Sequence, residues 1–308
     1  MGSFFAALST VAVMLLYACP GFLMVKTGLV KSASISDFAR LLMYVCQPAL
    51  TVYSFAQVDF SYTLVGEMLF VLIFVFIMLV AAMLFFRFVV FKGKSENVRY
   101  RIYTLAVCFA NCAFMGIPVL EALLPDYPQA VTFSAVFALA MNLLGWTFGS
   151  AIITNDPKYM SVKKILLNPA GLSLTVAIPL FVTGWDMPNE LYGMVTLLAR
   201  MTTPLCMLIM GMRLATANLR SVFLRPAQYL IIAIKGIAFP IAAWLLLSLF
   251  PVDENLKMSI YIMMACPVAS VVLNFAEMLG EGQEQAANLV LLSTGLSALT
   301  IPVMMLIV

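Results

Sequence analysis

Two proline-containing stretches in a very apolar chain carry the residue types that could bind a ligand. One reads Asn-Cys-Ala-Phe-Met-Gly-Ile-Pro over residues 111–118, and the other reads Ala-Cys-Pro-Val-Ala-Ser over residues 265–270. Proline removes a backbone hydrogen bond from a helix and frees a carbonyl, so each stretch is expected to interrupt its helix. A helix that restarts after a break presents unpaired N–H groups and a positive dipole end, which favour an anion. The pattern predicts an anion site built from two broken helices, with a simple proline kink in each helix as the alternative.

The candidate binding residues are the asparagines, the helix breakers and their apolar neighbours in these stretches. We expect freed amides and asparagine side chains to bind a carboxylate, while Phe114, Met115 and Val268 contact the rest of the substrate. The first stretch offers Asn111, Phe114, Met115, Gly116, Ile117 and Pro118, with the break placed at Gly116–Pro118. The second offers Pro267, Val268, Ser270 and Asn274.

A few other polar residues lie in apolar segments and are candidates for coupling or support. A charge at the centre of a membrane helix costs roughly 2.5–3.5 kcal/mol, so Arg200 should face protein or water. It is a candidate counter-charge for a carboxylate, or a structural partner for Glu67 or another acidic residue. Lys235 is also deep; a lysine there can snorkel, and a structural or proton-linked role is expected. Gln47 precedes Pro48, where loosened backbone could coordinate an ion, although hydrogen bonding within its own helix is the simpler expectation.

Composition excludes most other classes of protein. Hydrophobic residues make up 64% of the 308 residues and charged residues 10%, against roughly 45–50% and about 25% in soluble proteins. The absence of histidine excludes Ser-His-Asp and Cys-His catalysis and histidine-ligated metal sites. No complete Gly-x-x-x-x-Gly-Lys-Ser/Thr phosphate loop occurs, because Phe88 takes the place of the first glycine before Gly93-Lys94-Ser95, and this excludes ATP-driven transport by this chain. We therefore expect a polytopic membrane protein that is not an enzyme and has no cofactor, no metal and no nucleic-acid partner.

Hydropathy and charge predict ten membrane-spanning helices with both termini outside. Fourteen of the 17 basic residues fall on the side that the positive-inside rule assigns to the cytoplasm. The last cytoplasmic loop, with Glu281 and Glu284, is acidic and departs from that pattern. The predicted spans are 4–25, 36–56, 63–90, 102–124, 130–153, 166–184, 191–212, 227–249, 258–279 and 286–307. The basic residues of the four cytoplasmic loops are Lys26, Lys31, Arg40; Arg87, Lys92, Lys94, Arg99, Arg101; Lys158, Lys163, Lys164; and Arg213, Arg220, Arg225.

The chain also shows an internal repeat at an offset of 156 residues. Residues 41–48 align with residues 197–204, and Glu121 aligns with Glu277. Five spans in each half is an odd number, so the second copy must enter the membrane from the opposite face. This inverted repeat is common in secondary transporters. We predict one integral membrane unit with repeats at 1–155 and 156–308, and broken fourth and ninth helices.

The stretch from Asn111 to Pro118, with Met-Gly-Ile-Pro intact, resembles the auxin efflux carrier family. That family includes plant PIN-type auxin transporters and bacterial malonate and malate permeases. The resemblance implies ten helices in an inverted repeat, crossing fourth and ninth helices, an organic anion at the crossing, and elevator-like movement of one bundle. Asn111 and Pro118 match the first crossover and Pro267 the second. Asn142 lies where relatives carry a polar fifth-helix residue, and Glu67 roughly where they carry an acidic one.

The predicted function is secondary active transport of a small organic anion, such as an auxin-like acid or a dicarboxylate, across a plasma or inner membrane. H⁺ and Na⁺ are the candidate coupling ions, and a homodimer is a candidate assembly. Two alternatives stay open: a sodium-coupled symporter of the bile-acid-symporter type, and a membrane receptor that binds an organic acid without moving it.

Overall fold

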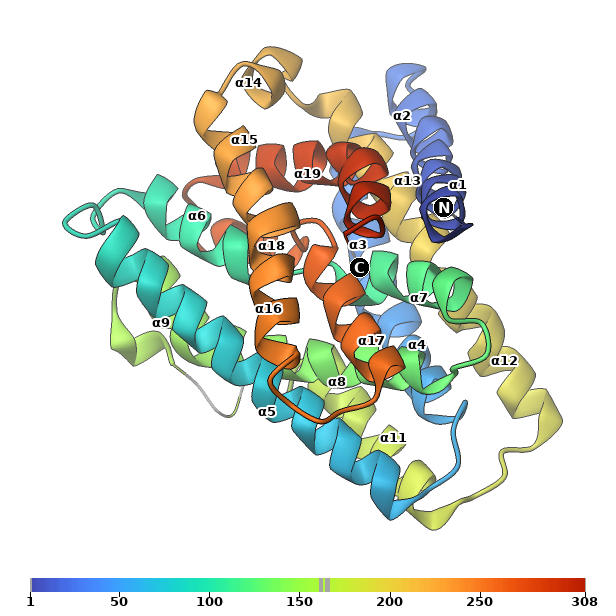
Figure 1. Ribbon diagram of the computed structural model, residues 1–308. Helices are drawn as coiled ribbons and strands as arrows, with labels where there is room; N and C mark the ends of the chain where they lie inside the picture. The colour runs from blue at the N-terminus through green and yellow to red at the C-terminus, as the bar shows by residue number, and fades with distance from the viewer. Residues whose placement is uncertain (1, 161–162, 164–166, 308) are drawn as a thin grey trace.

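The computed structural model describes residues 2–160, 163 and 167–307, and this part of the chain folds into helices (Figure 1). The predicted start of the sixth span at residue 166, and the basic residue Lys164, lie outside the described residues. Helices of the first half are α1 (Gly2–Leu16), α2 (Ala18–Lys26), α3 (Ile35–Leu41), α4 (Gln47–Phe55), α5 (Tyr62–Phe85), α6 (Val98–Cys108), α7 (Ile117–Leu123), α8 (Gln129–Leu144) and α9 (Ser150–Thr154).

The second half continues with nine helices among the described residues, and short π-helical turns join several neighbours in both halves. These helices are α11 (Pro169–Thr183), α12 (Asn189–Arg200), α13 (Thr202–Thr216), α14 (Leu219–Phe223), α15 (Pro226–Ala233), α16 (Phe239–Leu247), α17 (Glu254–Ala265), α18 (Val271–Leu279) and α19 (Gln283–Met304). The π-helical turns are Leu42–Cys46, Phe86–Val90, Cys112–Gly116, Gly145–Gly149 and Ile234–Ala238.

Six continuous helices in the described part are long and apolar enough to cross a membrane. Two shorter apolar helices, Cys112–Leu123 and Pro169–Thr183, accompany them. The outer face of α5 shows why such helices suit lipid, because Leu69, Ile73 and Ile77 recur every four residues and are exposed. The six long helices are Gly2–Lys26, Tyr62–Val90, Gln129–Thr154, Asn189–Thr216, Pro226–Leu247 and Gln283–Met304.

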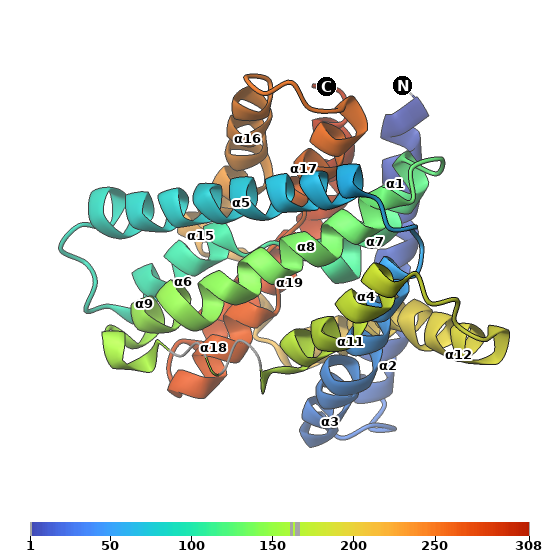
Figure 2. The same cartoon turned by 90° about the horizontal axis from the view of Figure 1, so that it is seen from below.

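The helices pack as two bundles. The first bundle contains α1–α4 and α11–α13; α2 packs along α13, and α4 packs on α11 and α12. The second bundle contains α5–α9 and α14–α19, with α5 on α8, α16 on α17 and α18 on α19. Figure 2 shows α2, α3, α4, α11 and α12 gathered on one side of the molecule, and α5, α6, α9 and α15 toward the other. Helix α1 lies at the boundary, where it contacts α7 and α19.

Two glycines allow the closest helix contact in the first bundle. A Cβ added at Gly211 of α13 would collide with the backbone carbonyl of Ala18, and one added at Gly21 of α2 would collide with the carbonyl of Leu208. Helices that lack side chains at the contact can bring their backbones together in a membrane. The joint between α2 and α13 therefore depends on both glycines.

Ion pairs explain the acidic loop that breaks the charge pattern of the sequence. Glu281 and Glu284 lie next to basic residues from other helices, so their charges are balanced locally. The pairs are Arg101–Glu281 at 3.9 Å and Arg225–Glu284 at 2.9 Å between nitrogen and oxygen.

Helix α1 begins and α19 ends on the same side of the molecule (Figure 2).

Candidate functional site

The centre of the molecule contains two helix interruptions that lie side by side. After α6 the backbone is extended around Phe109 and regains helical geometry at the turn Cys112–Gly116; after α17 it is non-helical from Cys266 to Ser270. Ala110 and Val268 form an antiparallel bridge. The N–H of Asn111 donates to the carbonyl of Pro267 at 2.8 Å, and the N–H of Ala269 donates to the carbonyl of Phe109 at 3.0 Å. Each interruption thus satisfies part of the backbone that the other leaves unpaired. We call this contact between residues 109–111 and 266–270 the crossing.

The first interruption lies earlier in the chain than the prediction placed it. Gly116 and Pro118 were expected to break the helix, but both have helical surroundings, and Pro118 lies in the first turn of α7. Pro118 cannot donate to the carbonyl of Phe114, four residues earlier, and that carbonyl instead accepts from Oγ1 of Thr203, so the helix Cys112–Leu123 continues through the proline. The carbonyl of Asn111 accepts hydrogen bonds from the N–H groups of Met115 and Gly116, which starts the new helix. Pro267 does lie inside the second interruption.

Backbone groups freed at the crossing find side-chain partners on neighbouring helices. The N–H of Val268 donates to Oγ of Ser293 on α19 at 3.1 Å. The N–H of Ala110 points at Sδ of Met141 on α8, 3.3 Å away, and a thioether is a weak acceptor. The first turn after each interruption carries further N–H groups that no helical carbonyl can reach. The crossing is therefore rich in hydrogen-bond donors.

A small cavity opens beside the crossing, between the two bundles. Its volume is about 20 Å³. The second bundle contributes the resumed helix after the first interruption and a face of α8, while the first bundle contributes α4 and the start of α11. Its lining is formed by Gln47, Leu50, Thr51, Ser54, Ala113, Ile117, Ala135, Ala138, Leu139, Asn142, Ala170 and Leu174. Amides and hydroxyls are the polar groups of this lining, and it includes no carboxylate.

Three predicted residues meet at this cavity: Gln47, Ile117 and Asn142. Asn142 also bonds reciprocally to Asn168, at the start of α11. Its Nδ2 donates to Oδ1 of Asn168 at 3.0 Å, and Nδ2 of Asn168 donates to Oδ1 of Asn142 at 3.3 Å. Asn168 in addition caps α11 by accepting from the N–H of Gly171 at 2.9 Å. This amide pair connects α8 of the second bundle with α11 of the first.

Asn111 is buried at the crossing, with 7% of its surface exposed. Its side chain lies near the thiol of Cys206 on α13. One turn away, Oγ1 of Thr203 donates to the carbonyl of Phe114 at 2.7 Å. Thr203 of α13 therefore holds the first turn of the resumed helix, from the opposite bundle.

Other predicted site residues face away from the cavity. Met115 is fully buried toward α19, where Oγ of Ser297 lies 3.7 Å from its Sδ. Val268 is fully buried, and Gly116 packs against Sγ of Cys266. Nδ2 of Asn274, in α18, lies 3.7 Å from Sδ of Met43, and Ser270 is half-buried just before that helix. The expectation that Met115 and Val268 contact substrate does not agree with this packing, because both side chains fill the core of the second bundle.

Of the acidic residues offered as partners of Arg200, Glu67 is not the one that lies beside it. Arg200 ends α12, and its guanidinium lies near the hydroxyl of Tyr53 and near Glu121. Glu67 instead neighbours Asp253 and Tyr127, at the beginning of α5. Tyr127 lies in the loop between α7 and α8, where burial, then the charges of Glu67 and Asp253, raise the pKa of its hydroxyl.

Lys235 does not snorkel toward the membrane surface. It is 1% exposed, and its Nζ donates to the carbonyl of Met264 at 2.6 Å, in the last turn of α17. The ammonium also lies 5.5 Å from the ring centroid of Phe239. The carbonyl at the interruption provides an acceptor inside the protein, so the lysine turns inward.

Several lining and supporting residues were missed by the sequence analysis. Ala113, which was missed, lies four residues before the predicted Ile117, and this places both on the same helix face once the helix restarts at Cys112. Thr51 and Ser54 were also missed, although their helical spacing from the predicted Gln47 along α4 indicates a polar helix face. For Cys206 no pattern in the sequence indicated its contact with Asn111.

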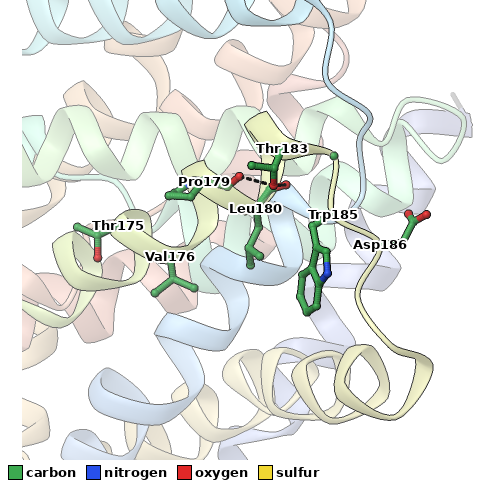
Figure 3. Close-up of a pocket in the computed structure, with 8 residues that line it drawn as sticks. Thr175, Val176, Pro179, Leu180, Thr183, Trp185 and Asp186 are labelled. Carbon is green, nitrogen blue, oxygen red and sulfur yellow. Dashed lines mark hydrogen bonds between the residues drawn. The ribbon is translucent and has the colours of Figure 1, made fainter.

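A larger open concavity lies elsewhere, over the outer face of α11 and the loop that follows it (Figure 3). Thr175, Val176, Leu180 and Trp185 line it, and Oγ1 of Thr183 donates to the carbonyl of Pro179 at 2.8 Å beside them. Several of these side chains are exposed apolar groups on a short apolar helix. The concavity contains no residue that the sequence singled out.

Comparison with known proteins decides the family. A family model described as membrane transport protein matches residues 6–163 and matches again over residues 157–305. The chain belongs to the membrane transport protein family. This is the auxin efflux carrier family that residues 111–118 resemble. No curated protein matches the chain.

Membership in the membrane transport protein family establishes the general activity. The chain is a multi-pass membrane protein that transports a small substrate, and its family is not a family of enzymes. In the described part of the chain, no three histidine, cysteine or acidic side chains are grouped as metal ligands.

Proposed function

We propose that the chain is a secondary transporter of a small organic anion, and that the anion binds between the two bundles beside the crossed interruptions. The observation that carries this proposal is the cavity lined by amide and hydroxyl groups from both bundles, with Gln47 from one and Asn142 from the other. Its lining includes no carboxylate that would repel an anion. The helix that restarts at Cys112 adds the positive end of its dipole, which favours negative charge.

The size of the cavity supports alternating access. About 20 Å³ accommodates about one water molecule, whereas pockets for organic ligands measure roughly 300–1,000 Å³. Substrate can enter only when the bundles separate along α4 and α8, which carry opposite walls of the cavity. We infer that the structure represents a closed state, and that an elevator-like displacement of the second bundle opens the site to each side in turn.

The proposed topology is ten spans in an inverted repeat, with both termini outside. The offset of 156 residues aligns Asn111 of the first interruption with Pro267 of the second, and these two residues are hydrogen-bonded. An even number of crossings also agrees with α1 beginning and α19 ending on one side of the molecule.

The experiment is counterflow in proteoliposomes that contain the purified chain. Vesicles are loaded with unlabelled malonate, malate or indole-3-acetate, and uptake of the same radiolabelled acid is followed against empty liposomes. We expect transient accumulation of at least one of the three acids. Binding detected by thermal shift without counterflow would instead establish a receptor. Binding and counterflow absent for all three acids would contradict the proposal.

Replacement of sodium by choline in the same assay separates the sodium-coupled alternative. A symporter of the bile-acid type loses accumulation in choline. We expect the rate in choline to stay within about twofold of the rate in sodium.

A further inference from the structure

A buried ammonium group lies at the crossing without an acidic partner. Lys235 is 1% exposed, in the π-helical turn Ile234–Ala238 between α15 and α16. The salt bridges found among the described residues do not include it. Its partners are the carbonyl of Met264, at 2.6 Å from Nζ, and the face of Phe239. A charged side chain inside a membrane protein is costly and marks a functional position unless it is fully compensated.

The position of the ammonium relative to the crossing gives it a specific electrostatic effect. Met264 is in the last turn of α17, Glu254–Ala265, where carbonyls lack helical partners and the helix dipole ends negative. Lys235 offsets that negative end with a full positive charge. The positive partial charge at the amino-terminal end of the helix that restarts at Cys112 therefore remains, while the negative partial charge at the carbonyl end of α17 is neutralised.

The same charge reaches the wall of the cavity. Nζ of Lys235 holds the carbonyl of Met264, two residues before Cys266, and Sγ of Cys266 packs against Gly116, next to the lining residue Ile117. Cys112 directly precedes Ala113, which lines the cavity. In a medium of low dielectric constant, the electrostatic interaction between two charges is far stronger than it is in water. An anion in the cavity is attracted, and a metal cation is repelled.

We propose that Lys235 is the fixed cation of the transport site: its ammonium at the carbonyl end of α17 makes the cavity select anions and removes the need for a bound metal cation. This inference rests on the proposed function and adds the source of its charge selectivity. Lys235 acts through the helix end and does not line the cavity, so it is a residue that determines specificity without contacting the substrate.

Two substitutions separate the charge of Lys235 from its hydrogen bond. Lys235→Gln keeps a donor for the Met264 carbonyl and removes the charge, and Lys235→Arg keeps both. Counterflow of malonate, malate and indole-3-acetate is measured for each variant, in sodium and in choline, together with the melting temperature in detergent. We expect Lys235→Gln to raise the KM of the transported acid at least tenfold, and Lys235→Arg to keep it within about fivefold.

The outcomes distinguish this inference from the proposed function. If the unsubstituted protein transports an acid and Lys235→Gln transports it with an unchanged KM, the role of the charge is overturned while the proposed function stands. If the unsubstituted protein transports none of the three acids, the proposed function fails first. The comparison of counterflow in sodium and in choline uses the unsubstituted protein, so it gives a result even if Lys235→Gln does not fold. A requirement for sodium in the unsubstituted protein would overturn the fixed-cation role of Lys235.

Discussion

Arg213 of α13 and Glu277 of α18 form an ion pair, with 3.1 Å between Nη1 and Oε1, that joins the two bundles at one end of the molecule. The repeat offset relates Glu277 to Glu121, which lies near the end of α7 and faces Arg200 of α12. Glu121 and Arg200 are both in the described part of the chain, and no nitrogen–oxygen distance between their side chains is 4.0 Å or less. The interface between the bundles therefore has an ion pair at the Glu277 end and a looser contact at the Glu121 end.

This asymmetry predicts that the Arg213–Glu277 pair stabilises the closed state. Its side chains are 21% and 47% exposed, and partly exposed pairs contribute about 0–1 kcal/mol. Glu277→Gln should therefore shift the balance of states by up to about fivefold. Labelling of a cysteine introduced at Thr51, in the cavity wall, measures that shift as a faster reaction with a thiol reagent.

The reversed pair Arg213→Glu with Glu277→Arg is the matched control for this shift. It should return the labelling rate toward that of the parent, because the attraction across the interface is restored. Equal labelling of the parent and Glu277→Gln would show that the pair has no part in closure.

Asn111→Ala tests the crossing itself. The substitution removes the amide that contacts Cys206 and leaves the backbone bridge to Pro267 in place. We expect counterflow to fall at least tenfold, with normal yield in the membrane. Asn97→Ala is the control, since Asn97 caps α6 through the N–H of Arg99 at 3.0 Å and its loss costs about 1 kcal/mol of helix stability. If both variants transport equally well, the site does not include Asn111.

Gly211→Ala tests the close joint of α2 and α13. The new methyl group would meet the backbone carbonyl of Ala18, which cannot move without displacing α2. Overpacking of this kind costs about 1–3 kcal/mol, so the melting temperature in detergent should fall. Gly193→Ala in α12 is the control, because a methyl group there meets nothing within 4 Å, and alanine favours a helix by about 1 kcal/mol over glycine. Equal melting temperatures for the two variants would show that the joint tolerates separation.

Much of the helical fold could be predicted because hydropathy is a local property of the chain. Span 63–90, for example, corresponds to the continuous helix Tyr62–Val90. The site depends on contacts between distant segments, and those were harder to predict. Pro118 was expected to break its helix, but the Phe114 carbonyl that it leaves free finds a donor in Thr203 of α13. The inward orientation of Lys235 was not predicted, because its acceptor, the Met264 carbonyl, is 29 residues away in sequence. The partners of Arg200 and the division into two bundles likewise follow from packing that periodicity does not encode.

The central claim is that transport requires the two bundles to move relative to each other, and a reversible cross-link tests it most directly. Arg213→Cys with Glu277→Cys places thiols on opposite bundles, while Gln57→Cys with Tyr192→Cys places them on the first bundle, where Nε2 of Gln57 donates to the Tyr192 hydroxyl at 2.8 Å. Counterflow is measured for each double variant before cross-linking with a short bifunctional thiol reagent, after it, and after reduction. We expect the 213–277 link to reduce counterflow at least tenfold and reduction to restore it, with the 57–192 link having little effect. Unchanged counterflow through a fully formed 213–277 link would contradict movement between the bundles.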